Sequence, residues 1–199
     1  MDLKPYFEAQ AKLDEHIIQQ KGLQGQDLLD KKILALQVEL GELANEARFF
    51  KYWSEDTKPR TSDACRNCSG YGEGYFSGDS YTGEKEKCVQ CGGSGKDHNV
   101  NPLLEEYADV IHFVIGLAND IGYTSHEYLK TEPKDLNNLV LGITNAITVF
   151  SMRPTKELME SILNNIIALG HQLGFDEKEV IEAYHAKNKE NHKRQEVGY

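Results

Sequence analysis

Four cysteines, arranged as two copies of the phrase Cys-x-x-Cys-x-Gly-x-Gly, constrain the fold of this chain more than any other feature. The first copy spans residues 65–72 and the second spans residues 88–95, and the chain contains no other cysteine. Two Cys-x-x-Cys pairs supply the four thiolates of a tetrahedral zinc site, and the glycines allow the backbone to turn tightly beneath the sulfur atoms. We therefore predict that one Zn²⁺ is bound by Cys65, Cys68, Cys88 and Cys91.

Two disulfides or a redox-active pair would use the same four cysteines. The chain begins Met-Asp-Leu-Lys-Pro, without an apolar signal region, so we expect a cytoplasmic location, where reduced thiols favour metal over disulfides. No strand-rich sequence surrounds the cysteines, which disfavours a redox motif. The repeated phrase resembles the zinc-binding repeats of DnaJ-type chaperones. Those chaperones carry more copies of it, so two copies imply one zinc site and not a chaperone.

The cysteine segment interrupts a helical protein. Residues 57–100 are rich in Gly, Ser, Asp and Tyr and lack helical periodicity, whereas long amphipathic stretches flank them on both sides. A unit this small cannot build a sufficient core, so a metal is expected to hold it together. We predict one all-α domain formed by residues 1–56 and 101–199, with the zinc unit of residues 57–100 inserted into it. The expected role of this unit is structural, and partner binding is the alternative.

Apolar periodicity predicts six helices, over residues 3–21, 27–54, 101–122, 134–151, 155–173 and 176–193. Asp27 and Asp176 are the expected N-caps of the second and last helices, and Asn101 followed by Pro102 is a typical helix start. No alternating apolar pattern is long enough for a core strand, although the zinc unit has room for a short hairpin. The predicted fold is an all-α helical bundle with a small zinc-binding insertion.

Composition disfavours two classes of partner. No apolar run reaches the roughly 18 residues of a transmembrane helix, so the chain is not expected to enter a membrane. Its formal net charge of −10 disfavours a nucleic-acid partner, and the acids of the zinc unit offset its few basic residues. A phosphate substrate would need bridging cations, so the excess of acids hints at metal sites. A solvated acidic surface is the alternative.

Two of the predicted helices carry a pair of acids beside an apolar face. Glu39 and Glu42 are three residues apart and share one face of the second helix, and Glu106 and Asp109 repeat the arrangement on the third. The apolar stripe beside the first pair consists of Leu36, Leu43, Ala47 and Phe50. Carboxylates next to a core must be paired, protonated or metal-bound. Ordinary surface acids are the alternative, but two such pairs favour a Mg²⁺ site.

The acid pairs resemble the signature of the all-α nucleoside triphosphate pyrophosphohydrolases, the MazG-like superfamily, and the surrounding sequence is closest to the dimeric dUTP diphosphatases. Four segments in order carry the resemblance: Gln10-x-x-Leu13-Asp14, residues 36–54, residues 105–113 and residues 187–199. Together they span most of the chain outside the zinc unit. The resemblance implies a homodimer that uses Mg²⁺ to hydrolyse dUTP, and dUDP as well, to dUMP, with release of pyrophosphate from dUTP.

The resemblance also implies roles for individual acidic and basic residues. Glu39, Glu42, Glu106 and Asp109 would hold the Mg²⁺ ions. Glu39 would in addition orient or deprotonate the attacking water, and Glu46 would support the acids from behind. Lys187, Asn191 and Arg194 share one face of the last helix and would bind phosphate oxygens. The alternative for these three is a basic helix end that complements its own dipole.

For the base, the resemblance assigns the first helix and an aromatic residue. Gln10 and Asp14 would read the pyrimidine edge, and Trp53 would supply a stacking face, with core packing as its alternative. Related enzymes often carry Asn where Asp14 stands. His112 is expected to be structural and not a ligand. Two rival interpretations are a sibling enzyme acting on dCTP or a modified nucleotide, and a zinc-dependent protein-binding module on a helical scaffold.

Overall fold

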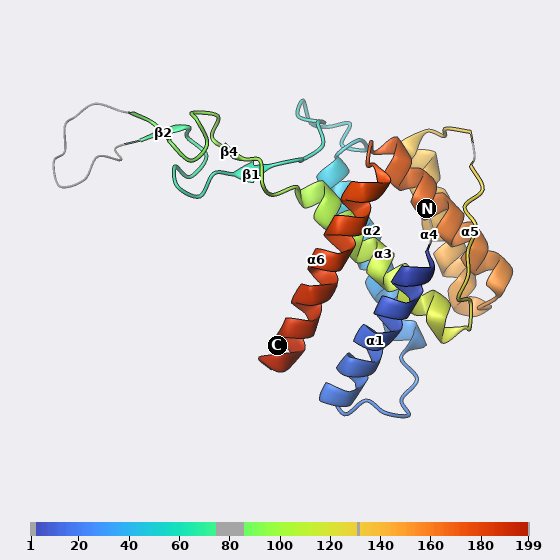
Figure 1. Cartoon of the computed structure of the whole chain (residues 1–199). Helices are drawn as coiled ribbons and strands as arrows, with labels where there is room; N and C mark the ends of the chain where they lie inside the picture. The colour runs from blue at the N-terminus through green and yellow to red at the C-terminus, as the bar shows by residue number, and fades with distance from the viewer. Residues whose placement is uncertain (1–2, 75–85, 131, 199) are drawn as a thin grey trace.

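The computed structural model describes residues 3–74, 86–130 and 132–198, so Tyr199 of the C-terminal segment lies outside it. Within these residues the chain is mainly helical, as predicted (Figure 1). The helices are α1 (Lys4–Gln20), α2 (Leu29–Ala47), α3 (Pro102–Asp120), α4 (Leu136–Met152), α5 (Lys156–Gln172) and α6 (Glu177–Glu196). None of these helices is both long and apolar enough to cross a membrane.

Two of the three predicted N-cap residues, Asn101 and Asp176, are correct. The Asn101 side chain accepts a hydrogen bond from the Leu104 N–H at 3.3 Å, and Pro102 begins α3. At α6 the Asp176 side chain accepts from the Glu179 N–H at 2.8 Å, and the Glu179 side chain accepts from the Asp176 N–H at 3.1 Å. This reciprocal capping satisfies two N–H groups that would otherwise lack partners.

The predicted limits of α2 are wrong at both ends. The N-cap is Leu28, and Asp27 instead accepts a hydrogen bond from the Leu29 N–H at 3.0 Å. The helix ends at Ala47 because Arg48 adopts the left-handed conformation, with φ 63°. The Arg48 side chain is buried and donates to the Asp56 carbonyl at 2.7 and 3.0 Å, which turns the chain back on itself.

The early end of α2 changes the surroundings of one residue of the predicted apolar stripe. Leu36, Leu43 and Ala47 are buried as expected, whereas Phe50 lies in the turn after the helix and is 36% exposed. The apolar face of α2 is therefore shorter than the sequence pattern suggested. Residues 48–60 form a loop that leads from the bundle to the zinc unit.

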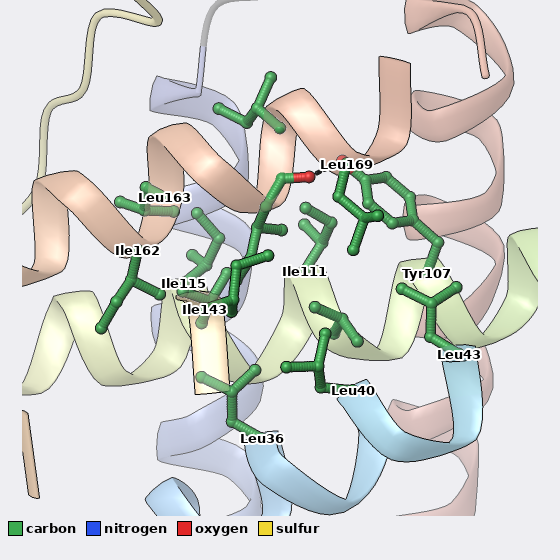
Figure 2. Close-up of a cluster of buried hydrophobic side chains, with 14 of the residues drawn as sticks. Leu36, Leu40, Leu43, Tyr107, Ile111, Ile115, Ile143, Ile162, Leu163 and Leu169 are labelled. Carbon is green, nitrogen blue, oxygen red and sulfur yellow. Dashed lines mark hydrogen bonds between the residues drawn. The ribbon is translucent and has the colours of Figure 1, made fainter. Parts of the chain in front are cut away.

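The core is built around α3, in which eleven of the 19 residues are buried. It contacts α1, α2, α5 and α6, while α4 packs against α2 and α5. Figure 2 shows aliphatic side chains from α2, α3, α4 and α5 meeting around Ile111 and Ile115. At one end of this core the Tyr107 hydroxyl donates to the Ile166 carbonyl at 3.2 Å. The ring lies directly against Gly170, where a Cβ atom would collide with it.

The zinc unit projects from the bundle as an arm (Figure 1). Strand β1 (Asp63–Ala64) pairs antiparallel with β4 (Lys96–Asp97), and β2 (Glu73–Gly74) pairs antiparallel with β3 (Glu86–Lys87). The four cysteines form a buried cluster separate from the main core. The hairpin expected in this unit is thus present as two very short ladders on either side of the cysteines.

Candidate functional site

Three of the four predicted acids converge at the α2–α3 contact. Glu39, Glu42 and Glu106 each offer a carboxylate oxygen, and these atoms all lie within 4.8 Å of one another. Burial, followed by the nearby charges of Asp109 and Glu42, raises the pKa of Glu39 to about 7. Burial and the other acids likewise raise the pKa of Glu106 to about 7. Crowded carboxylates of this kind suit a hard divalent cation such as Mg²⁺, which prefers oxygen ligands.

Asp109, the fourth acid, is held by a cation from α6. Its Oδ2 lies 2.8 Å from the Lys187 Nζ, and both side chains are 18% exposed. Burial raises the pKa of Asp109, and Lys187 opposes that shift. The structure therefore places Lys187 at the edge of the acid cluster, as a phosphate-binding role would require, although here it neutralises an acid.

The other two basic-face residues of α6 differ in position. Asn191 lines the cavity described below, together with Asp109. Arg194 donates to Asn191 Oδ1 at 3.4 Å and pairs with Glu190 at 2.6 Å. The helical spacing thus brings Lys187 and Asn191 to the site, and the charge of Arg194 also acts on Asp109, whose pKa it lowers against the effect of burial.

A cavity of about 350 Å³ lies between α1, α2, α3 and α6. Its apolar lining comprises Leu13, Ile17, Ile18, Leu23, Leu28, Ala35 and Phe113. The polar groups include Gln10 and Asp14 at one side and Asp109 and Asn191 at another. Largely apolar walls with a few convergent polar groups are typical of small-molecule sites. Because Asp109 is part of the wall, the cavity adjoins the acids.

A network of hydrogen-bonded side chains adjoins Gln10 and Asp14 in the cavity wall. Gln10 Nε2 donates to Asp14 Oδ1 at 2.7 Å, and Gln10 Oε1 lies 2.7 Å from His112 Nδ1. Tyr184 adds a hydroxyl 3.1 Å from Gln10 Oε1 and stacks on His112 with centroids 4.0 Å apart. His112 is 3% exposed, in keeping with the structural role expected for it.

Sequence reasoning missed Lys32 and Tyr184. Lys32 pairs with Asp14 at 2.9 Å and with Asp120 at 2.8 Å, so it joins α1, α2 and α3 beside the cavity. Neither contact has a local spacing signal, since the partners lie on different helices. Tyr184 looks like any aromatic of an amphipathic helix until the fold places its ring on His112.

Trp53 does not line the cavity in this structure. It follows the end of α2 and is 65% exposed, so it is not a core residue either. It packs edge-to-face with Phe50 and Tyr52, with centroids 5.7 and 5.1 Å apart. Because α2 ends at Ala47 and not near residue 54, Trp53 leaves the helix surface on which its predicted position depended.

The four cysteines of the arm lie at zinc-binding distances. Cys65 Sγ is 3.8 Å from Cys88 Sγ, and Cys68 Sγ is 3.7 Å from Cys91 Sγ. Four sulfurs bound to one Zn²⁺ at tetrahedral angles would be about 3.8 Å apart, whereas a disulfide requires about 2.05 Å. Asn67 donates to Cys88 Sγ and lowers the pKa of that thiol to about 6, which favours the thiolate. This donor set fits zinc.

Glycines allow the two halves of the arm to cross. Gly72 and Gly95 have φ of 74° and 73°, a region that disfavours side chains. A Cβ on Gly72 would collide with the Gly93 carbonyl, and one on Gly95 would collide with the Gly70 carbonyl. The same glycines donate their N–H groups to Cys68 and Cys91 sulfurs at 3.2 and 3.3 Å. The glycines of the repeated phrase are thus required by the close approach of the two backbone segments.

Comparison with known proteins gives one match. A family model described as dUTPase matches residues 2–66 and 93–199, which include the acid cluster and the polar side of the cavity. The residues between the two matched parts contain Cys68, Cys88 and Cys91. No curated protein and no solved structure matched the chain.

Proposed function

The chain belongs to the dUTPase family and hydrolyses dUTP to dUMP, and from this premise we propose that the reaction requires Mg²⁺ bound by the acids of α2 and α3. The convergence of Glu39, Glu42 and Glu106 within 4.8 Å carries the proposal. Asp109 would complete the site once Lys187 moves from its carboxylate to a phosphate oxygen. Paired Glu-x-x-Glu and Glu-x-x-Asp motifs on packed helices also support a relationship to the MazG-like pyrophosphohydrolases.

Each group of residues in the site would have its own role in the reaction. Bound Mg²⁺ would neutralise phosphate charge and make a bound water more acidic. Glu39 is half-buried at the acid cluster, and it would orient or deprotonate the attacking water. Lys187 and Asn191 would hold phosphate oxygens, and Gln10 and Asp14 would contact the base in the cavity. We propose that water attacks the β-phosphorus and that dUDP is also a substrate.

The direct test is hydrolysis of dUTP, dUDP, dTTP, dCTP and UTP with and without Mg²⁺. We expect dUTP and dUDP to be used, chelation to abolish turnover, and Glu42→Gln to be inactive. Glu105→Gln removes an exposed acid next to the cluster and should be as active as the wild type. In ¹⁸O-labelled water the label should enter pyrophosphate. Label in dUMP would contradict attack at the β-phosphorus, and full activity in chelator would contradict the metal site.

For the arm we propose one Zn²⁺ bound by the four cysteines, in the manner of DnaJ-type repeats, and a bracing role. Arg60 lies where the arm meets the bundle. Its N–H donates to the Glu46 carbonyl at 3.0 Å, and its own carbonyl accepts from the Leu103 N–H at 3.1 Å. One residue thus joins the last turn of α2 to the first turn of α3 through groups that lack helical partners. The β1–β4 pairing just beyond it would hold this junction closed.

We also propose a homodimer. Apolar side chains of α2 and α4 that remain exposed form one face: Leu34, Val38, Leu141, Val149 and Met152. Gln37 Nε2 donates to Thr148 Oγ1 at 3.4 Å across the same two helices. Leu141→Lys should give a monomer in light scattering, whereas Leu129→Lys, in an exposed loop, should not. The reduced thiols that zinc requires favour a cytoplasmic location.

A further inference from the structure

We propose that His112 and Tyr184 are positioning residues that fix the orientation of the Gln10 amide and so make the enzyme prefer uracil to cytosine. The inference rests on the proposed function, in which Gln10 contacts the base. Tyr184 does not line the cavity, and His112 forms only part of its wall. Their effect on the substrate would pass through Gln10.

The two ends of the Gln10 amide have different partners. Its oxygen lies 2.7 Å from His112 Nδ1 and 3.1 Å from the Tyr184 hydroxyl, whose one proton is shared between Gln10 and the Tyr6 carbonyl at 3.2 Å. Its nitrogen donates to Asp14 Oδ1 at 2.7 Å. The side chain is only 5% exposed, so water cannot replace these partners freely. The amide is therefore held from both ends.

A reversed amide would lose its hydrogen bond to Asp14. The Gln10 oxygen would then face the Asp14 carboxylate, which accepts hydrogen bonds and is ion-paired with Lys32 at 2.9 Å. Placing two acceptors together in a buried site costs about 1–3 kcal/mol, the penalty of an unsatisfied polar group. Asp14 therefore turns the Gln10 oxygen toward His112 and Tyr184, and that buried oxygen then requires a donor from one of them.

The protonation state of His112 bears on whether its ring donates a hydrogen bond to Gln10. Burial lowers the pKa of His112 to about 4, so the ring is neutral at pH 7 and carries a single N–H. Its two ring nitrogens face two acceptors, Gln10 Oε1 at 2.7 Å and the Tyr184 carbonyl at 3.1 Å. Because Asp14 turns the Gln10 oxygen toward this ring, we place the proton on Nδ1, which then donates to Gln10. Stacking on Tyr184, with an interplanar angle of 11°, keeps the imidazole in that plane.

The fixed amide presents a donor to the cavity. Gln10 Nε2 has two hydrogens, and the contacts among the described residues use one of them, for Asp14. In our proposal the other donates to the C4 carbonyl oxygen of the base, because the C2 carbonyl is common to uracil and cytosine and could not distinguish them. Uracil and thymine offer carbonyls at C2 and C4, whereas cytosine has an amino group at C4, which would meet another donor. The arrangement therefore separates uracil from cytosine and leaves thymine to be excluded by shape.

The test measures kcat/KM for dUTP, dCTP and dTTP in His112→Phe, Tyr184→Phe and the double variant. Phenylalanine keeps the ring stack and removes the donor. In the double variant we expect the dUTP/dCTP ratio to fall by roughly ten-fold, mainly through KM for dUTP, because the loss of a buried hydrogen bond is worth about 1.4 kcal/mol. The dUTP/dTTP ratio should not change, whereas general damage to the site would alter both ratios.

The Gln10→Ala variant separates the positioning role of His112 and Tyr184 from the base contact of Gln10. If it lowers the dUTP/dCTP ratio and the ring variants do not, the positioning role of His112 and Tyr184 is wrong and the base contact stands. If Gln10→Ala leaves the dUTP/dCTP ratio unchanged, Gln10 does not contact the base, and His112 and Tyr184 cannot act through it. If the double variant does not fold, the dUTP/dCTP ratios of His112→Phe and Tyr184→Phe alone test the positioning role.

Discussion

The described residues include two clusters of potential metal ligands, and the two are built in opposite ways. The thiolates of the arm come from one short segment, and their sulfurs lie 3.7–3.8 Å apart in pairs, at the spacing that zinc requires. The carboxylates of the bundle come from α2 and α3, on either side of the arm, and rest on an apolar core formed without them. The arm should therefore depend on its metal to fold, whereas the bundle should depend on its metal only to react.

The largest effect should come from the acid cluster. Glu106→Gln is expected to lower kcat by about 100- to 1,000-fold, the typical cost of losing a group that stabilises charge in the transition state. The same change should leave the unfolding temperature equal or higher above pH 7, because it removes a charge from a crowded site. Paired activity and thermal-melting measurements with Glu105→Gln as control test both. A destabilised Glu106→Gln protein would contradict the separation of fold from reactivity in the bundle.

The acidity of the cluster gives the next largest effect. Glu39 and Glu106 have pKa values of about 7, so below that pH Mg²⁺ must displace their protons. We expect the apparent Mg²⁺ affinity to rise by about ten-fold per pH unit for each proton displaced, and so by up to about 100-fold per unit below pH 7, and to level off above it. Titration calorimetry in buffers of different ionisation enthalpy should detect the released protons. An affinity independent of pH between 5.5 and 7 would show that these acids are not ligands.

The same shifts predict the stability of the metal-free protein. An unfolded glutamate has an ordinary pKa near 4.5, so between about pH 4.5 and 7 the folded state binds more protons than the unfolded state. The free energy of unfolding should therefore fall as pH rises through this window, and Mg²⁺ should reverse the fall. Loss of zinc should leave this pH dependence of the free energy of unfolding unchanged, because the carboxylates of the bundle cause it.

Removing zinc should have a smaller effect on catalysis. Cys88→Ser is expected to lose Zn²⁺ and to expose residues 57–100 to proteolysis, while the circular-dichroism signal of the helices remains. Turnover should fall only by about three- to ten-fold, the effect of about 1 kcal/mol of lost bracing. Val89→Ser, at a neighbouring position that is 92% exposed, is the control. Cooperative loss of helix in Cys88→Ser would show that the bundle also depends on zinc.

The smallest expected effect concerns Arg60, where two variants distinguish the contribution of its backbone N–H to stability from that of its side chain. Arg60→Pro removes the N–H that reaches the Glu46 carbonyl and should lower the free energy of unfolding by about 1 kcal/mol. Arg60→Ala removes only the exposed ion pair to Glu46, at 3.4 Å, and should cost about 0.5 kcal/mol or less. Urea denaturation measures both. Equal losses would indicate that the side chain, and not the backbone bridge, joins α2 to α3.

Helix existence could be predicted more reliably than helix ends. The periodicity of the chain identified all six helices, and the caps at Asn101 and Asp176 were correct because capping depends on neighbouring residues. The end of α2 was missed because it depends on Arg48, whose left-handed backbone is held by contacts with Asp56. Nothing in the local pattern of residues 48–54 opposes a helix strongly enough to show this.

The sequence by itself determined the two Cys-x-x-Cys pairs and the two acid pairs, because those patterns are set by spacings of three residues within one segment. The tertiary structure alone decided that Lys187 neutralises Asp109, that Lys32 joins Asp14 to Asp120, and that Trp53 stands outside the cavity. It also decided that His112 and Tyr184 lie behind Gln10. Contacts between helices depend on how the apolar faces pack, and no local spacing encodes that packing.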